Sequence, residues 1–309
     1  MKTNILLVGH GSRNKNGNRE IEEFAATWRA MNPQWQIETC FIEFAEVLID
    51  QGLDNAAQGA ERVIVVPLIL NAAGHVKMEI PHFIADARQR HPGVEFIYAR
   101  HLGATDAVLD ILKRNLRKVM MSLDMPDPKS TGVILLGRGS SDRVANGEVA
   151  KIARWLFEES DHELVDIAFT GITYPRLETA VQRQVALGMT QVAILPYYLF
   201  TGTLIERIKR QVERLQTQYP QTAIANGNYF GFEDEIYALL NQRVNEAMGE
   251  IDDAECTMME CDGCLYRQEA EAEHHHHHDH GHDDPHHHDH SHHQAHPHAH
   301  PLAHKEPKV

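Results

Sequence analysis

Two histidines stand beside glycines in segments that have the character of a metal site. His10 lies in V-G-H-G-S-R at residues 8–13, and His75 lies in N-A-A-G-H-V-K-M-E-I-P at residues 71–81. Each segment follows an apolar run that is typical of a buried strand. Neutral imidazole is the commonest metal ligand among side chains, and it also accepts protons near neutral pH. The two histidines therefore indicate a centre that binds a divalent ion, and a turn with an incidental histidine is the alternative interpretation of His10.

A carboxylate and several turn residues accompany the histidines. Glu43 ends the segment C-F-I-E at residues 40–43, so we expect it at the same sheet edge. A His, His and Glu set suits cobalt, nickel, iron or zinc, and a solvated carboxylate is the alternative interpretation of Glu43. Glycine turns and nearby helix N-termini let a large anionic ligand approach closely. The residues expected to contact such a ligand are Gly9, Gly11, Ser12, Arg13 and Gly74.

The elements that must position these residues alternate between strand and helix patterns. Such alternation indicates right-handed βαβ units in an α/β fold, with ligands at the carboxyl ends of parallel strands. The predicted strands are 3–9, 36–42, 62–69, 94–99, 132–136, 164–170, 191–197 and 222–227. The predicted helices are 17–31, 46–58, 77–90, 104–121, 144–159, 176–187, 203–218 and 232–248.

The second half of the chain repeats the first at a spacing of 128 residues. The recurring residues are Gly9, Gly11, Ser12 and Asn18, which return as Gly137, Gly139, Ser140 and Asn146. The segment at 122–132 is rich in Pro, Asp, Ser and Gly and is predicted to be a linker. We therefore expect two duplicated three-layer αβα domains of flavodoxin-like topology, 1–122 and 131–249, facing each other across a cleft, and a tail at 250–309.

The repeat keeps the turn residues and loses the metal ligands. The counterparts of His10, Glu43 and His75 are Arg138, Gly171 and Leu204. The sequence thus predicts one metal site, in the first half, with the second half as the opposing wall. We expect Arg138 to pair with a carboxylate of the ligand, and a surface arginine is the alternative.

Composition and charge narrow the class of protein. The chain has 309 residues and a formal net charge of −15, which argues against a nucleic-acid binder. No apolar run approaches the roughly 20 residues that span a bilayer, and the N-terminus lacks the features of a secretory signal. We therefore expect a cytoplasmic protein with neither a nucleic acid nor a membrane as partner.

The tail holds two further metal-binding patterns. Cys256, Cys261 and Cys264 fall within one short segment, which suits one iron–sulfur or zinc centre better than a disulfide framework. A reduced, metal-free C-x-x-C is the alternative. Most of the 23 histidines follow Glu273 in a polar tract that is predicted to be disordered. Histidine-rich tracts bind divalent metals, so we expect it to store or deliver Co2+ or Ni2+, the alternative being a purification tag.

Taken together, three strand-end segments resemble the long form of the CbiX type of class II chelatase. They are G-H-G-S-R, F-I-E-F-A-E and P-L-I-L-x-x-x-G-H-x-x-x-E-I-P, and the resemblance covers about residues 1–250. It implies ATP-independent insertion of Co2+ into sirohydrochlorin, a tetrapyrrole polycarboxylate, for cobalamin biosynthesis; close relatives insert iron or nickel. It also implies that His10 and His75 are the metal-binding and catalytic histidines and that Glu43 lies near the metal. The cysteine motif resembles that of long-form members, which implies a [4Fe–4S] cluster.

Two other functions fit parts of the sequence. A metal store or metallochaperone would depend on residues 250–309, whereas a chelatase would work without them when metal is plentiful. A hydrolase built on Ser12 lacks the G-x-S-x-G elbow, and the ATP-binding pattern G-x-x-x-x-G-K-[ST] is absent. One chain holds both halves of the cleft, so we expect a monomer, or a homodimer if two tails share a cluster.

Overall fold

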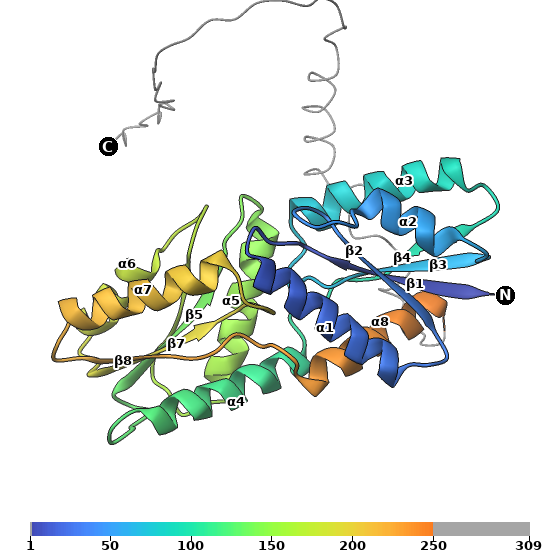
Figure 1. Cartoon of the computed structure of the whole chain (residues 1–309). Helices are drawn as coiled ribbons and strands as arrows, with labels where there is room; N and C mark the ends of the chain where they lie inside the picture. The colour runs from blue at the N-terminus through green and yellow to red at the C-terminus, as the bar shows by residue number, and fades with distance from the viewer. Residues whose placement is uncertain (1, 250–309) are drawn as a thin grey trace, which may run out of the picture. The chain divides into compact units, whose positions relative to one another are not determined.

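The computed structural model describes residues 2–249, which form two parallel sheets of four strands each (Figure 1). The first sheet has the order β2-β1-β3-β4 and the second has the order β6-β5-β7-β8. The strands are β1 (Thr3–Gly9), β2 (Gln36–Phe41), β3 (Arg62–Pro67), β4 (Glu95–Tyr98), β5 (Thr131–Gly137), β6 (Val165–Phe169), β7 (Gln191–Pro196) and β8 (Ala223–Asn226). The identical orders confirm the predicted duplicated α/β fold with flavodoxin-like winding.

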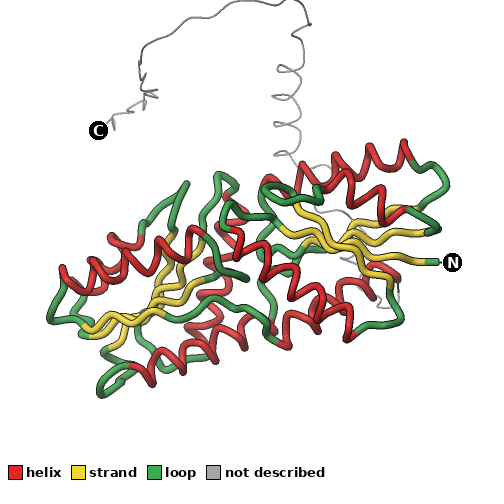
Figure 2. The backbone as a smooth tube through the Cα atoms, viewed as in Figure 1, coloured by secondary structure: helices red, strands yellow, loops and turns green. Residues whose placement is uncertain are grey.

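Eight α-helices flank the two sheets within the described residues (Figure 2). They are α1 (Lys15–Met31), α2 (Ile49–Ala57), α3 (Ile80–Arg90), α4 (Asp106–Ser122), α5 (Arg143–Glu158), α6 (Leu177–Ala186), α7 (Thr203–Gln218) and α8 (Asp234–Met248). A short π-helix, η1 (His75–Glu79), leads directly into α3. The sequence pattern predicted a helix from residue 77 and gave no sign of the π-helical turn.

Each sheet is buried on both faces because its central strands carry continuous apolar runs, such as I-L-L-V in β1 and V-I-L-L in β5. In β1, Leu6 and Val8 pack with α2 and α3, while Ile5 and Leu7 face the opposite way, toward α1. The second sheet repeats this division. Ile134 of β5 packs with α6 and α7, and the other face of β5 packs with α5. Continuous apolar runs of this kind are what a doubly covered parallel sheet requires.

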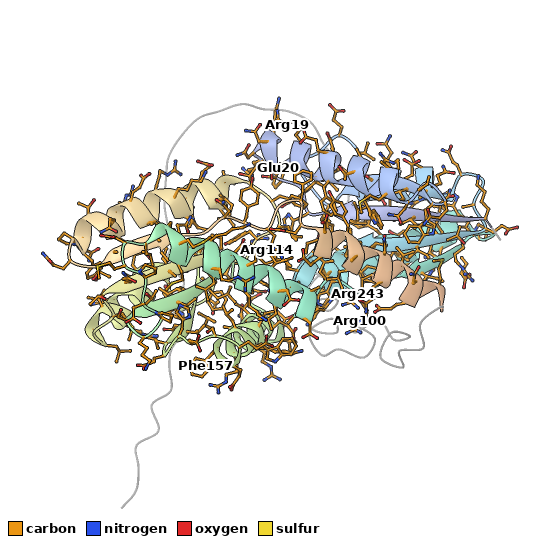
Figure 3. The ribbon with its side chains drawn as sticks, turned by 90° about the horizontal axis from the view of Figure 1, so that it is seen from below. Arg19, Glu20, Arg100, Arg114, Phe157 and Arg243 are labelled. Carbon is orange, nitrogen blue, oxygen red and sulfur yellow. The ribbon has the colours of Figure 1, made fainter. Side chains whose placement is uncertain are left out.

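The last helix of each half packs on the sheet of the other half. Helix α4 follows β4 in the chain but packs against β7, β8 and α5, and α8 packs against β3. The two helices also meet each other: the guanidinium of Arg114 on α4 lies 2.7 Å from both Glu233 and Glu235 at the start of α8 (Figure 3). One hydrophobic cluster consequently joins both halves. Helices α4 and α8 thus pack across the division predicted at 1–122 and 131–249.

The tail predictions lie outside the described residues. They concern Cys256, Cys261, Cys264 and the histidine-rich tract. Within residues 2–249, no helix combines the length and apolar character that crossing a bilayer requires.

Candidate functional site

The carboxyl ends of β1 and β5 open onto one cavity of about 650 Å3. Both halves of the chain line it, so the predicted cleft is present. His10 and Glu43 reach it from the first half and Arg138 from the second. Of the residues expected to contact a ligand, Gly11, Ser12, Arg13 and Gly74 line the cavity. Gly9 does not; it ends β1 where a Cβ would press on Ile21 and Phe41, so its small size serves packing.

His10 is held in one tautomer by its neighbours. Its Nδ1 lies 3.1 Å from the carbonyl oxygen of Gly11 and 3.5 Å from Oε1 of Glu43, so Nδ1 carries the proton. Nη1 of Arg138 donates to Nε2 of His10 at 2.9 Å, because a guanidinium has only donors. Nε2 therefore presents a lone pair toward the second half, which is the form of histidine that binds a metal ion.

Glycine at position 11 is required by the turn itself. Gly11 has φ of +89°, and a Cβ there would stand 1.7 Å from the carbonyl oxygen of Glu43. Gly139 repeats both properties, with φ of +85° and a Cβ that would lie 2.4 Å from the carbonyl oxygen of Gly171. The close approach lets the Glu43 amide donate to the His10 carbonyl oxygen at 3.2 Å. The turn thus brings the carboxylate of Glu43 beside the imidazole.

The repeated serine and asparagine form matching clamps behind the two turns. Oδ1 of Asn18 accepts from the Ser12 amide at 2.7 Å, and Oδ1 of Asn146 accepts from the Ser140 amide at 3.0 Å. In the first half the clamp extends further, because Nδ2 of Asn18 donates to the carbonyl oxygen of Phe44 at 2.6 Å. Their repetition in the sequence therefore reflects loop architecture, whereas the residue between the two glycines differs, being His10 in the first turn and Arg138 in the second.

The loop that carries His75 is anchored to the second half by a buried ion pair. The backbone of His75 begins η1 beside the cavity-lining Gly74, whereas its side chain is outside the described set. Nζ of Lys77, two residues further along η1, lies 2.7 Å from Oδ2 of Asp142. Oδ1 of Asp142 also caps α5 by accepting from the Val144 amide at 2.8 Å. The sequence analysis missed this pair, since neither residue stands in a repeated motif.

The wall contributed by the second half contains tyrosines that the sequence analysis did not select. Tyr197 and Tyr198 follow β7, at the place where I-L-P-Y-Y-L repeats the apolar run around Pro67. The Tyr198 hydroxyl lies 2.7 Å from that of Thr170, and burial raises the pKa of Tyr198 to about 12. Burial also raises the pKa of Tyr197, whose hydroxyl is buried without a hydrogen-bond partner among the described residues, so both tyrosines are neutral at physiological pH.

Glu20 of α1 fastens this wall to the first half (Figure 3). One carboxylate oxygen accepts from the Thr201 amide at 2.9 Å, and the other accepts from the Tyr229 hydroxyl at 2.6 Å. Gly17 permits the approach, because a Cβ there would stand 2.8 Å from the Thr201 carbonyl oxygen. The cavity is thus shaped by polar contacts between halves.

The predicted metal ligands are brought together in part. His10 and Glu43 are neighbours, but among the described side chains no three His, Cys, Asp or Glu residues gather as a metal site. The second half holds the predicted replacements: Arg138 faces His10, and Leu204 lines the cavity. Gly171 occupies the place of Glu43, since its amide donates to the Arg138 carbonyl oxygen at 3.0 Å. The described side chains thus bring two of the three predicted ligands, His10 and Glu43, into contact.

Comparison with known proteins identifies relatives over most of the described part of the chain. The CbiX family matches residues 4–119 and again residues 132–247. A sirohydrochlorin cobaltochelatase of Priestia megaterium is 40% identical over 269 residues, 85% of this chain and 84% of the relative. SirB from Bacillus subtilis with Fe3+ has a TM-score of 0.69 at 31% identity, over 80% of this chain and 96% of SirB. The sirohydrochlorin chelatase SirB from Bacillus subtilis subspecies spizizenii, in complex with cobalt, has a TM-score of 0.68 at 29% identity, over 81% of this chain and 97% of that SirB chain.

Proposed function

The chain belongs to the CbiX family, and from this premise we propose that it is a metal chelatase that inserts Co2+ into sirohydrochlorin without ATP. The observation that carries the proposal is the contact of His10 with Glu43 on one side of its ring and with Arg138 on the other, in a cavity lined by both halves. The relative at 40% identity is named for this reaction. Cobalamin biosynthesis is the corresponding pathway.

In this proposal Co2+ is a substrate that is bound and then released. His10 offers Nε2 to the ion, and His75 is the proposed second imidazole ligand. Glu43, whose carboxylate contacts the Nδ1 side of His10, would turn from that contact to offer an oxygen to the ion. Few protein ligands leave positions open on the ion, so the ring nitrogens of the tetrapyrrole can replace water and then protein. A fully enclosed site would hold the metal too tightly to deliver it.

Insertion also requires a base, because two pyrrole N–H protons leave as the metal enters. The Glu43 carboxylate stands at the cavity and is partly exposed, so it can accept a proton and pass it to solvent. The metal-free imidazole of His75 is the other proposed acceptor. The net charge of the ring is unchanged, because one divalent ion replaces two protons.

Cationic groups at the rim suit the carboxylates of the ring substituents. Arg138 and Arg13 both line the cavity. The guanidinium of Arg138 donates a hydrogen bond to Nε2 of His10. The lone pair that accepts this hydrogen bond is the one that a metal ion would bind. A ring carboxylate that binds Arg138 would therefore free His10 for the ion, which makes Arg138 a proposed substrate residue that also couples the two substrates.

The proposal is tested by mixing the purified full chain with sirohydrochlorin and Co2+ and following the absorption spectrum. His10→Ala is expected to slow insertion about 100-fold, the scale of losing a metal ligand or base. His82→Ala is the control, because His82 is an exposed histidine on α3 that pairs with Asp86. Insertion at the wild-type rate by both His10→Ala and His75→Ala would refute the assignment of these residues.

Iron or nickel insertion is the second candidate. One SirB structure carries Fe3+ and the other carries cobalt, so the shared fold accommodates more than one metal. Affinity order alone does not select among these ions at a nitrogen and oxygen site. Competition between equal concentrations of Co2+, Ni2+ and Fe2+, read from the product spectra, decides between the candidates.

The cysteine motif is proposed to hold an iron–sulfur or zinc centre. Cys256, Cys261 and Cys264 supply three thiolates, whereas a [4Fe–4S] cluster takes four. The remaining cysteine, Cys40, is fully buried in β2, and burial raises the pKa of its thiol. The fourth ligand would therefore be a different residue type, another chain or an added group. No step of insertion depends on this centre.

The histidine-rich tract is proposed to collect Co2+ or Ni2+ for the site. Deleting residues 250–309 is expected to preserve insertion at high metal concentration and to slow it when metal is scarce. Complete loss at high metal would favour the alternative, a storage or delivery protein. The proposed active unit is a monomer, because the cavity is built from the two halves of one chain.

A further inference from the structure

Two exposed apolar side chains occupy matched positions at the cavity. Phe44 follows β2 and Ile172 follows β6, separated by the spacing of the repeat. Both line the cavity, and they are 44% and 59% exposed. Neither belongs to the hydrophobic clusters formed by the described residues. Core packing therefore does not account for an apolar residue at either place.

Both residues also have an unfavourable backbone conformation. Phe44 has φ of +55° and Ile172 has φ of +60°, which bulky and β-branched residues rarely adopt. At Ile172 the Thr173 amide donates to the Gly171 carbonyl oxygen at 2.6 Å, closing a γ-turn of the strained kind. Glycine would adopt either conformation without strain. The two side chains thus combine exposure with backbone strain, a combination found where a ligand is held.

We infer that Phe44 and Ile172 are the apolar contacts for the tetrapyrrole ring, one from each half; this inference rests on the proposed function. The ring is flat and apolar, and its carboxylates lie at the edge, so a site must pair apolar surface with cations. Arg13 and Arg138 supply cations in the same cavity. The guanidinium carbon of Arg13 lies 4.7 Å from the centre of the Phe44 ring. This contact sets the position of the aromatic ring and places a cation beside it.

The first test measures binding of metal-free sirohydrochlorin to the full chain, from the change in the absorption of the ligand. Phe44→Ala and Ile172→Ala are each expected to weaken binding about tenfold, because an apolar side chain no longer covers the ring. In insertion assays the same variants raise KM for sirohydrochlorin more than they lower kcat. Leu187→Ala is the matched control: Leu187 is 67% exposed at the end of α6 and does not line the cavity.

A second pair of variants separates ligand contact from a structural role. Phe44→Gly and Ile172→Gly remove the same side chains and relieve the positive φ. Each is expected to unfold at the wild-type temperature or above and still to bind sirohydrochlorin about tenfold more weakly. If all four variants bind sirohydrochlorin as the wild type does, the inference is refuted and the proposed function is unaffected. The same holds if binding is weak only in variants that unfold at a lower temperature than the wild type. Failure of the wild type to bind overturns both.

Discussion

The buried pair between Lys77 and Asp142 is predicted to hold the His75 loop in place. The two charged atoms are 2.7 Å apart, and the side chains are only 7% and 4% exposed. Removing one partner of such a pair leaves an unpaired buried charge and costs about 3–5 kcal/mol. Lys77→Met is therefore expected to lower the free energy of unfolding by that amount. Asp142→Asn is expected to cost a similar amount, although asparagine can keep the cap on α5.

The double variant distinguishes the pair from two separate effects. With Lys77→Met and Asp142→Asn combined, no buried charge remains, so the loss is expected to be about 2 kcal/mol smaller than the sum of the single losses. Urea unfolding of the three variants gives the coupling. The single variants should also lower kcat for cobalt insertion, because η1 carries both Lys77 and His75.

The exposed pair of Lys113 and Glu159 provides the matched control. Its charged atoms are also 2.7 Å apart, but both side chains are accessible to solvent. Lys113→Met should therefore change stability little. If Lys77→Met costs no more than Lys113→Met, or if the single losses add in the double variant, the reasoning from burial is refuted.

Three further predictions concern the turn, a buried histidine and the arginine at the site. Gly11→Ala is expected to abolish insertion and to destabilise the protein by about 2 kcal/mol or more, because φ is positive and the Glu43 carbonyl oxygen blocks the Cβ. The control is Gly93→Ala, where a Cβ meets no other atom, so the free energy of unfolding measured in urea should barely change. Burial lowers the pKa of His101 to about 3, against an ordinary 6.5, so the unfolded chain binds a proton between these values and the folded chain does not. The contribution of His101 to the free energy of unfolding is fully present above about pH 6.5 and decreases as the pH falls below that value. Between about pH 7.5 and about pH 5, the free energy of unfolding of the wild type should therefore decrease by about 2 kcal/mol more than that of His101→Gln. Arg138→Met is expected to bind Co2+ alone about fivefold more tightly, since one hydrogen bond of about 1 kcal/mol no longer competes for His10. It should also bind sirohydrochlorin more weakly, and titrations with each substrate that show neither change would contradict this role.

Periodicity predicted the elements because the burial pattern of this fold is local. The run I-L-L-V before Gly9 is apolar on both faces, as a central parallel strand must be, and β1 ends where the run ends. The same logic placed His10, Glu43 and Arg138 at one edge of their sheets. Parallel strands bring their carboxyl ends together, so position in the sequence sufficed to bring these residues to one cavity.

The exchange of α4 and α8 was not predictable from the same patterns. An apolar stripe shows which face of a helix is buried, but it does not show which of two similar sheets covers it. The contacts of His10 with Arg138 and of Lys77 with Asp142 depend on that pairing of halves. The π-helix at His75–Glu79 also escaped prediction, because one additional residue in a turn barely alters a period of 3.6.

The pairing of His10 with Arg138 depends on the halves being joined in one chain. In a dimer of identical units, any substitution at the turn would appear on both sides of the cavity, so histidine would face histidine and arginine would face arginine. Fusion of the two units lets each copy of the turn vary alone. The contact between Nη1 of Arg138 and Nε2 of His10 is one that strict twofold symmetry forbids. The two sides of the cavity can therefore differ, so that the proposed metal ligand His10 and the proposed carboxylate-binding Arg138 face each other.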